Sequence, residues 1–222
     1  MAEPALQPPR EAASASAWPT GWALPLIESP ATTEPTRRAL RARLNAPAGL
    51  PVGALPAFFS PDAYETFAAA CARLVPADGL AGPVDVAPAI DARLACGHGD
   101  GWRYATLPPD GDAFQTGVSL LDRAAEAAYA ERFCDLAPDA QDELLADAQH
   151  ARGAFGPDAS GGFDACRWFA DWLAEAAGLF YGHPLAQQDI GYAGFADAPG
   201  WTRIGLGERD AHEPDPLTDA LL

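Results

Sequence analysis

The chain has 222 residues, and its 31 acidic against 14 basic residues give a net charge of −17. All the basic residues are arginine, because the sequence contains no lysine. This balance provides no basic groove, which argues against nucleic acid and anionic lipid surfaces as partners. The length suits one domain of good size that needs no metal or disulfide to hold its core together.

We expect no targeting or membrane segment in this sequence. The first twenty residues carry Glu3 and Glu11 and no apolar run of signal-peptide length, so we expect no secretory or twin-arginine signal. No window approaches 18 uncharged apolar residues, so we expect no membrane span. The sequence leaves both a cytoplasmic and a periplasmic location open.

The four cysteines lie far apart in the sequence, and none belongs to a CxxC motif. Zinc and iron–sulfur sites usually need that closer spacing. We therefore expect four small apolar thiols on helices, with a disulfide pair as the open alternative. The residues are Cys71, Cys96, Cys134 and Cys166.

Clear helical signals begin at Ser60, which can cap a helix that starts with Pro61. Apolar residues then recur at helical spacing in five segments. The first spans 61–75, the second follows the capping residue Asp85, the third spans about 112–131, the fourth begins at Pro138, and the fifth spans 163–180. The fifth is apolar over more than half of its circumference and is the predicted central helix.

Two different segments flank this helical domain, which we place at residues 58–184. Residues 1–57 are rich in proline and are expected to form an extended arm with one short helix near 34–44. This arm carries Trp18 and Trp22, so we expect it to wrap on a surface, with a flexible leader as the alternative. Residues 185–222 are rich in glycine and aromatic residues and are expected to be irregular. The predicted fold is therefore mainly α, a compact domain of about five helices with extended, aromatic-rich N- and C-terminal arms.

The sequence lacks the usual signatures of catalysis. It has no GxGxxG loop in a strand-to-helix setting, no GxSxG, no HExxH, and no lysine for a phosphate-binding loop. Asp147 and His150 have the spacing found in di-iron proteins, but those sites need a second such pair, which does not occur. We therefore predict a solvent-facing helix surface there, and no catalytic residue, metal or cofactor in this chain.

A series of short motifs runs from Phe58-Phe59 to about Arg209. No single motif is diagnostic, but their order and spacing together are fairly specific. In this pattern the chain resembles subunit 3, the small subunit, of gluconate 2-dehydrogenase-like complexes. The motifs include Arg73-Leu74-Val75-Pro76, Leu120-Leu121-Asp122, Tyr181-Gly182-His183-Pro184, Ile190-Gly191-Tyr192 and Pro199-Gly200-Trp201.

The resemblance implies an accessory role. In that family the small subunit binds a large FAD-dependent dehydrogenase of the glucose–methanol–choline oxidoreductase type, which holds the flavin and the catalytic residues. A cytochrome c subunit often accepts the electrons. The resemblance thus places FAD in the partner and no cofactor in this chain. The alternative is a stand-alone helical binding or scaffold module without a flavoprotein partner.

Aromatic residues on irregular segments are typical anchors of protein interfaces. We predict that such residues in the two arms, together with part of the Tyr181–Pro184 motif, contact the partner. The alternative is that the C-terminal aromatic residues fold back on the helices of the same domain. The predicted partner contacts are Trp18, Trp22, Tyr181, His183, Tyr192, Phe195 and Trp201.

Overall fold

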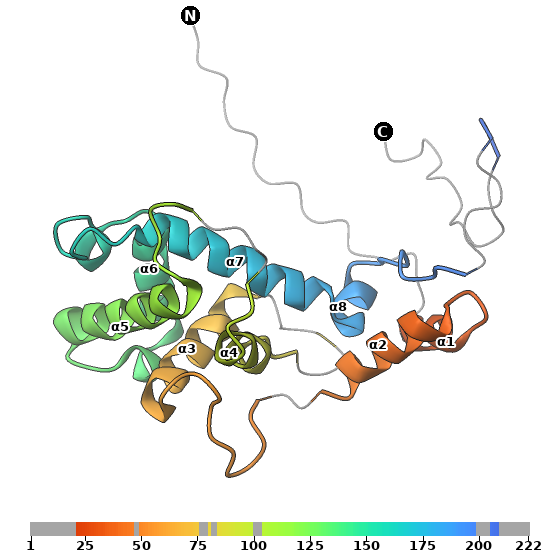
Figure 1. The fold of residues 1–222 in the computed structure, drawn as a ribbon, viewed down its shortest axis with the longest axis horizontal. Coiled ribbons are helices and arrows are strands. Elements are labelled where there is room, and N and C mark those ends of the chain that lie inside the picture. Colours follow the sequence, from red (N-terminus) through yellow and green to blue (C-terminus); the bar gives the residue numbers. More distant parts are fainter. Residues whose placement is uncertain are drawn as a thin grey trace, which may run out of the picture.

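The computed structural model describes residues 21–46, 49–75, 80, 84–99, 104–198 and 205–208. Within these ranges the chain forms eight α-helices and two short 3-10 helices and no strand (Figure 1). The prediction of a mainly α fold is confirmed. More α-helices form than the five predicted in the domain and the one predicted near 34–44, because two further short helices occur next to the domain. None of the helices described is long and apolar enough to cross a membrane.

Five helices form the body of the protein and correspond to the five predicted segments. Two 3-10 helices lie in the connections on either side of α6. The central helix α7 packs against each of the other four body helices, as its broad apolar surface predicted. The elements of the body are α3 (Pro61–Leu74), α4 (Ala87–Ala95), α5 (Asp110–Tyr129), η1 (Phe133–Asp135), α6 (Pro138–Gln149), η2 (Gly153–Phe155) and α7 (Ala165–Tyr181).

Local capping explains where several body helices begin. The Ser60 hydroxyl accepts a hydrogen bond from the backbone N–H of Ala63 at 3.3 Å, and Pro61 supplies the preset backbone angle of a first helical residue. Before α4, the carboxylate of Asp85 accepts from the N–H of Ala87 at 2.9 Å. The predicted Ser60 cap is confirmed, whereas the N-cap of α4 is Val86, so Asp85 bonds to the first residue of α4 from one position before the cap.

An aromatic cluster fills the core between α3, α5 and α7. Trp168 and Trp172 of α7 stack at 5.1 Å between ring centroids, and Phe67 of α3 stacks on Trp172 at 5.5 Å. Phe114 of α5 meets both indoles edge-on. Gly117 lets α5 approach closely, since a Cβ atom there would lie 2.1 Å from Cε2 of Trp168. The burial of so many aromatic side chains stabilises the body without a crosslink. All four cysteines are free thiols.

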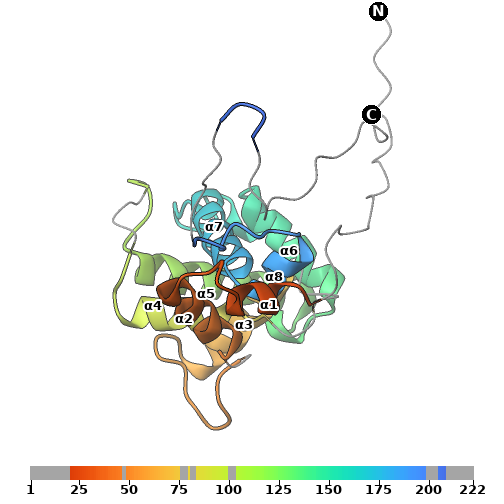
Figure 2. The same cartoon turned by 90° about the vertical axis from the view of Figure 1, so that its right-hand side faces the viewer.

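Three short helices lie together beside the C-terminal end of α7 (Figures 1 and 2). They are α1 (Ala23–Glu28), α2 (Glu34–Leu44) and α8 (Pro184–Asp189). The short helix predicted near 34–44 is confirmed as α2, whereas α1 was not predicted. We expected irregular chain from residue 185 onward, and this is wrong for residues 185–189, which are helical. Pro184 starts α8 instead, because proline is favoured at the first helical position and His183 caps it.

Candidate docking surface

Residues 21–46 and 182–198 form a unit that we call the terminal lobe. Its small apolar core is separate from that of the body and consists of Trp22, Ala23, Ile27, Leu40 and Phe195. The rings of Trp22 and Phe195 are nearly parallel, with centroids 6.0 Å apart, and both side chains are 8% exposed. The two flanking segments therefore pack on each other, although most of the sequence lies between them.

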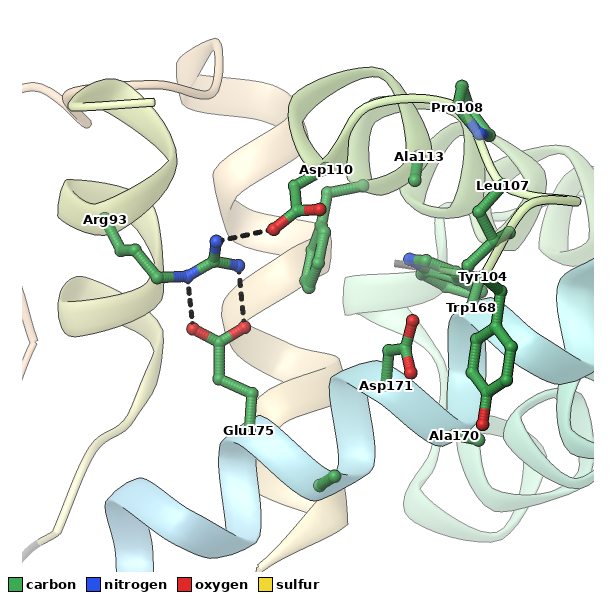
Figure 3. Close-up of a pocket in the computed structure, with 12 residues that line it drawn as sticks. Arg93, Tyr104, Leu107, Pro108, Asp110, Ala113, Trp168, Ala170, Asp171 and Glu175 are labelled. Carbon is green, nitrogen blue, oxygen red and sulfur yellow. Dashed lines mark hydrogen bonds and ion pairs between the residues drawn. The ribbon is translucent and has the colours of Figure 1, made fainter. Parts of the chain in front are cut away.

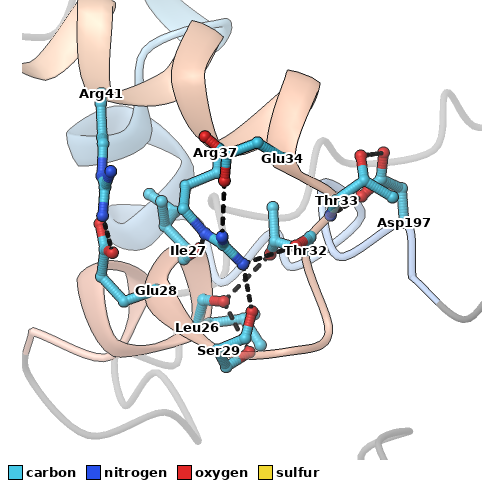
Figure 4. A network of polar contacts seen from close by, with 10 residues as sticks. All are labelled: Leu26, Ile27, Glu28, Ser29, Thr32, Thr33, Glu34, Arg37, Arg41 and Asp197. Carbon is cyan, nitrogen blue, oxygen red and sulfur yellow. Dashed lines mark hydrogen bonds and ion pairs between the residues drawn. The ribbon is translucent and has the colours of Figure 1, made fainter.

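Asp197 fastens the C-terminal segment to the start of α2 (Figure 4). Its carboxylate accepts hydrogen bonds at 2.7 Å from the backbone N–H and the hydroxyl of Thr33 and from the hydroxyl of Thr36. These bonds, first among them the one from the Thr33 N–H, lower the pKa of Asp197 to about 2. Beside them, the N–H of Ala198 donates to the carbonyl of Ala31 at 2.8 Å.

Arg37 holds α1 and α2 in a fixed arrangement (Figure 4). Its guanidinium donates to the carbonyls of Ile27, Ser29 and Thr32 at 2.8–2.9 Å, where the end of α1 leaves backbone acceptors without helical partners. It also pairs with Glu34 at 2.8 Å. One arginine thus organises the whole turn between the two helices.

Arg43 and His183 bond the end of α2 to the short connection between α7 and α8. Arg43 donates to the carbonyl of Gly182 at 2.6 Å, and Nε2 of His183 donates to the carbonyl of Arg43 at 3.1 Å. Nδ1 of His183 accepts from the N–H of Leu185 at 3.2 Å, so the imidazole here is the neutral Nε2–H tautomer. Burial is the main cause that lowers the pKa of His183.

Gln188 makes a second connection between the two segments of the lobe. Its carbonyl accepts from the indole N–H of Trp22, and its side-chain oxygen accepts from the N–H of Ala23, both at 3.3 Å. These two contacts set α1 directly against α8.

Exposed apolar side chains gather on the terminal lobe and on the last turn of α7 next to it. Five of the nine large hydrophobic residues that are exposed in the described part of the chain lie there. Their exposed fractions run from 38% to 56%. We call this set the docking surface: Leu24, Leu179, Tyr181, Ile190 and Tyr192.

The structure divides the predicted partner contacts into groups. Tyr181 and Tyr192 are 42% and 51% exposed and belong to the docking surface. Trp22 and Phe195 are buried against each other, so these two arm residues pack between the arms and not, as the fold-back alternative describes, on the helices of the domain. The half-buried His183 bonds to Arg43 within the lobe. Binding by all of these residues remains a prediction. Trp18 and Trp201 lie outside the described residues.

Sequence reasoning missed Leu24 and Ile190 of the docking surface and the connecting residues Asp197 and Gln188. Leu24 and Ile190 fall in short apolar stretches where helix turns decide which side chain faces out, and neither α1 nor α8 was predicted. Asp197 and Gln188 bond to residues more than 160 positions away, and no local pattern signals such pairs. One sequence signal was available: His183-Pro184 is a pattern typical of a helix start, and it would have predicted α8.

Asp147 and His150 lie at the C-terminal end of α6, and each bonds to a residue nearby in the sequence. Asp147 pairs with Arg152 at 2.9 Å, and Nδ1 of His150 donates to the carbonyl of Ala146 at 2.7 Å. In the part of the chain that the structure describes, no group of three or more His, Cys, Asp or Glu side chains could hold a metal ion.

These features define a helical protein in which five of the nine exposed large hydrophobic residues of the described chain lie on the terminal lobe or the adjoining last turn of α7. A family model described as gluconate 2-dehydrogenase subunit 3 matches residues 61–201, which is more than half of the chain. The chain therefore belongs to the gluconate 2-dehydrogenase subunit 3 family, a subunit of a dehydrogenase complex. The match includes α8 and Tyr192 but not α1 or α2. No curated protein and no solved structure matched the chain.

Proposed function

We propose that this chain is a non-catalytic accessory subunit that binds and stabilises a large FAD-dependent sugar, polyol or alcohol dehydrogenase. In this proposal the partner holds FAD and performs the redox chemistry, and a cytochrome c subunit is a further partner. Membership of a family named for a dehydrogenase subunit supports the existence of a complex. It does not by itself identify the surface that binds.

The concentration of exposed apolar side chains on the terminal lobe carries the proposal. Ile190 and Tyr192 are more than half exposed, and they lie two residues apart directly after α8. Burying such a side chain in an interface contributes roughly 1–2 kcal/mol each, since only the part now exposed would leave water. Aromatic residues in a patch of this kind are the usual anchors of an interface. The lobe therefore offers a partner apolar area whose burial would favour binding.

Co-expression with a flavoprotein encoded next to this chain tests the proposal. The double variant Ile190→Ser/Tyr192→Ser removes apolar area from the docking surface. The matched control, Val52→Ser/Leu55→Ser, removes exposed apolar area from the loop before α3, outside the lobe. We expect the wild-type chain and the control to co-purify with a yellow flavoprotein, and the docking variant to lose it while keeping its helical circular dichroism.

Two outcomes would contradict the proposal. In one, the docking variant recovers as much flavoprotein as the wild type. In the other, the wild-type chain recovers none, stays monodisperse alone and melts cooperatively, which is the behaviour of a stand-alone helical module.

A further inference from the structure

The charges of this chain are divided unevenly between its two parts. The described residues from 49 to 181, which form the body, hold 18 acidic side chains and six arginines. The terminal lobe holds four acidic side chains and four arginines, so it is neutral as a whole. An acidic partner is therefore repelled by the body and is not repelled by the lobe.

Two of the four arginines of the lobe have no carboxylate partner within the described residues. All four lie on α2, beside α1 and α8 (Figure 2). The exposed Arg38 bonds to no described group, and the side chain of Arg43 donates only to the carbonyl of Gly182. The other two, Arg37 and Arg41, form ion pairs with glutamates. Two guanidinium charges of α2 are thus left without a neighbouring counter-charge in the described chain.

Most arginines of the body, by contrast, are bound to carboxylates. Arg93 donates to both carboxylate oxygens of Glu175 and to Asp110, on the wall of a cavity between α4, α5 and α7 (Figure 3). Three further arginines of the body form ion pairs: Arg73, Arg132 and Arg152. Four of the six described arginines of the body are therefore neutralised by neighbours, in a part of the chain that is already acidic.

Arg38 lies close to the α1 side of the docking surface. It stands three residues before Arg41, so the two side chains are neighbours on the surface of α2. Arg41 pairs with Glu28 of α1, and Glu28 lies four residues after the exposed Leu24 on the same short helix (Figure 4). Residues at this spacing share one helix face. The guanidinium of Arg38 is therefore linked through neighbouring side chains to Leu24.

Arg43 lies close to the other side of the docking surface. Its guanidinium donates to the carbonyl of Gly182 at 2.6 Å, and Gly182 directly follows the exposed Tyr181. The apolar side chains of the docking surface are thus bordered by positive charge on two sides. Arginine in such a position is a common interface residue, because its guanidinium binds a carboxylate with two parallel hydrogen bonds.

We propose that the dehydrogenase surface that receives the terminal lobe is acidic around an apolar centre, with carboxylates that pair with Arg38 and Arg43. This inference rests on the proposed function, because it describes the partner's side of the same contact. The apolar side chains contribute affinity, whereas the arginines accelerate the encounter and fix its orientation. The acidic body repels the same surface, so the lobe is the part of the chain that binds it.

A second copy of this chain also offers an acidic surface, namely its body, but two observations disfavour that occupant. Each copy carries a net charge of −17, so two copies repel one another. A contact of lobe to body is also head-to-tail, and such a contact must close into a ring or continue into an open assembly. The dehydrogenase is favoured because the arginines border the docking surface proposed for it.

Association kinetics test this inference. The flavoprotein of the co-expression experiment is purified and immobilised, and binding of the full chain is followed by surface plasmon resonance at about 50 and 500 mM NaCl. Arg38→Glu reverses a charge on the lobe at a side chain that makes no bond to the described fold. The matched control, Arg123→Glu, reverses an exposed arginine on α5 of the body and changes the net charge by the same amount.

We expect Arg38→Glu to lower the association rate constant roughly fivefold to tenfold at about 50 mM NaCl, and to change the dissociation rate constant less than about threefold. Arg38→Lys keeps the charge and should associate within about twofold of the wild type, as should Arg123→Glu. At about 500 mM NaCl the rates of Arg38→Glu and the wild type should converge, because salt screens the attraction.

Three results would overturn this inference and leave the accessory role intact. Arg38→Glu could associate as fast as the wild type, Arg123→Glu could slow association equally, or the loss in Arg38→Glu could persist at high salt. Self-association of the wild-type chain alone that Arg38→Glu abolishes, measured by analytical ultracentrifugation, would overturn it in favour of a second copy. A wild-type chain that binds no flavoprotein would overturn the proposed function and this inference together.

Discussion

The carboxylate of Asp197 accepts a hydrogen bond from the backbone N–H of Thr33 at 2.7 Å, across a separation of 164 residues. Thr33 is the N-cap of α2, yet its own side chain does not cap the helix. The acceptor at this helix start comes from the other end of the fold. The terminal lobe therefore depends on both flanking segments being present at once.

Removal of this carboxylate should loosen the lobe and spare the body. In Asp197→Ala, the N–H of Thr33 and the hydroxyls of Thr33 and Thr36 lose their shared acceptor. We expect faster amide hydrogen exchange in residues 21–46 and unchanged exchange in α3, α5 and α7. Asp189→Ala removes an exposed carboxylate from the same lobe and should leave exchange unchanged. Equal exchange rates in both variants would show that Asp197 does not fasten the lobe.

The lobe should also open at low pH. The pKa of Asp197 is about 2 in the folded lobe, below the ordinary aspartate value of about 3.9. A lowered pKa means that the open lobe binds the proton more readily, so the stabilisation is present above about pH 4 and is lost as the pH falls toward 2. Exchange of the α2 amides, corrected for intrinsic rates, should rise over that interval. In Asp197→Asn this pH dependence should be much flatter, and an equal dependence would rule out Asp197 as its source.

The contact between α5 and α7 should tolerate no added carbon at Gly117. A Cβ atom there would lie 2.1 and 2.2 Å from two carbons of the Trp168 indole. We expect Gly117→Ala to lower the free energy of unfolding by about 1–3 kcal/mol, as overpacking does. Gly178→Ala on α7 meets no atom within 4 Å and should be neutral or stabilising by up to about 1 kcal/mol. Urea denaturation measures both, and a neutral Gly117→Ala would mean that the helices can separate without cost.

Asp91 should be essential for the turn that precedes α3. This carboxylate is 1% exposed and accepts from the backbone N–H groups of Ala57, Phe58 and Phe59 at 2.6–3.1 Å. Asp91→Asn replaces an acceptor with an amide that cannot satisfy all three donors. We expect a loss of roughly 2–4 kcal/mol in the free energy of unfolding.

The matched control for that substitution is Asp85→Asn in the same region. Asp85 is exposed, the one donor to it within the described residues is the N–H of Ala87, and asparagine serves as well as aspartate at a helix start. Its stability should stay close to that of the wild type. Similar losses in the two variants would mean that the buried turn does not depend on Asp91.

The body of the fold was predictable because its signals are local. Ser60-Pro61 marks the start of α3, and apolar spacing identified the central helix from residues such as Trp168 and Trp172. The terminal lobe was not predictable in the same way. Proline after His183 is consistent with a helix end before it or a helix start at it, and in the structure both occur, since α7 ends at Tyr181 and α8 starts at Pro184. No short-range pattern relates Trp22 to Phe195, which meet only in the folded chain.

The candidate docking surface was predicted in part. Tyr192 was chosen for its aromatic character and Tyr181 as part of the Tyr181–Pro184 motif, and both are exposed. Trp22 and Phe195 share that character but fill the core of the lobe. Sequence alone cannot distinguish an aromatic anchor from an aromatic core residue, because the same gain in free energy on leaving water drives the burial of both.

Hydrogen–deuterium exchange of the full chain, alone and bound to its dehydrogenase partner, tests the docking role most directly. The account predicts that binding slows exchange mainly in residues 21–46 and 179–198, which contain the docking surface. Protection confined to α3, α5 and α6, with the terminal lobe unchanged, would contradict it.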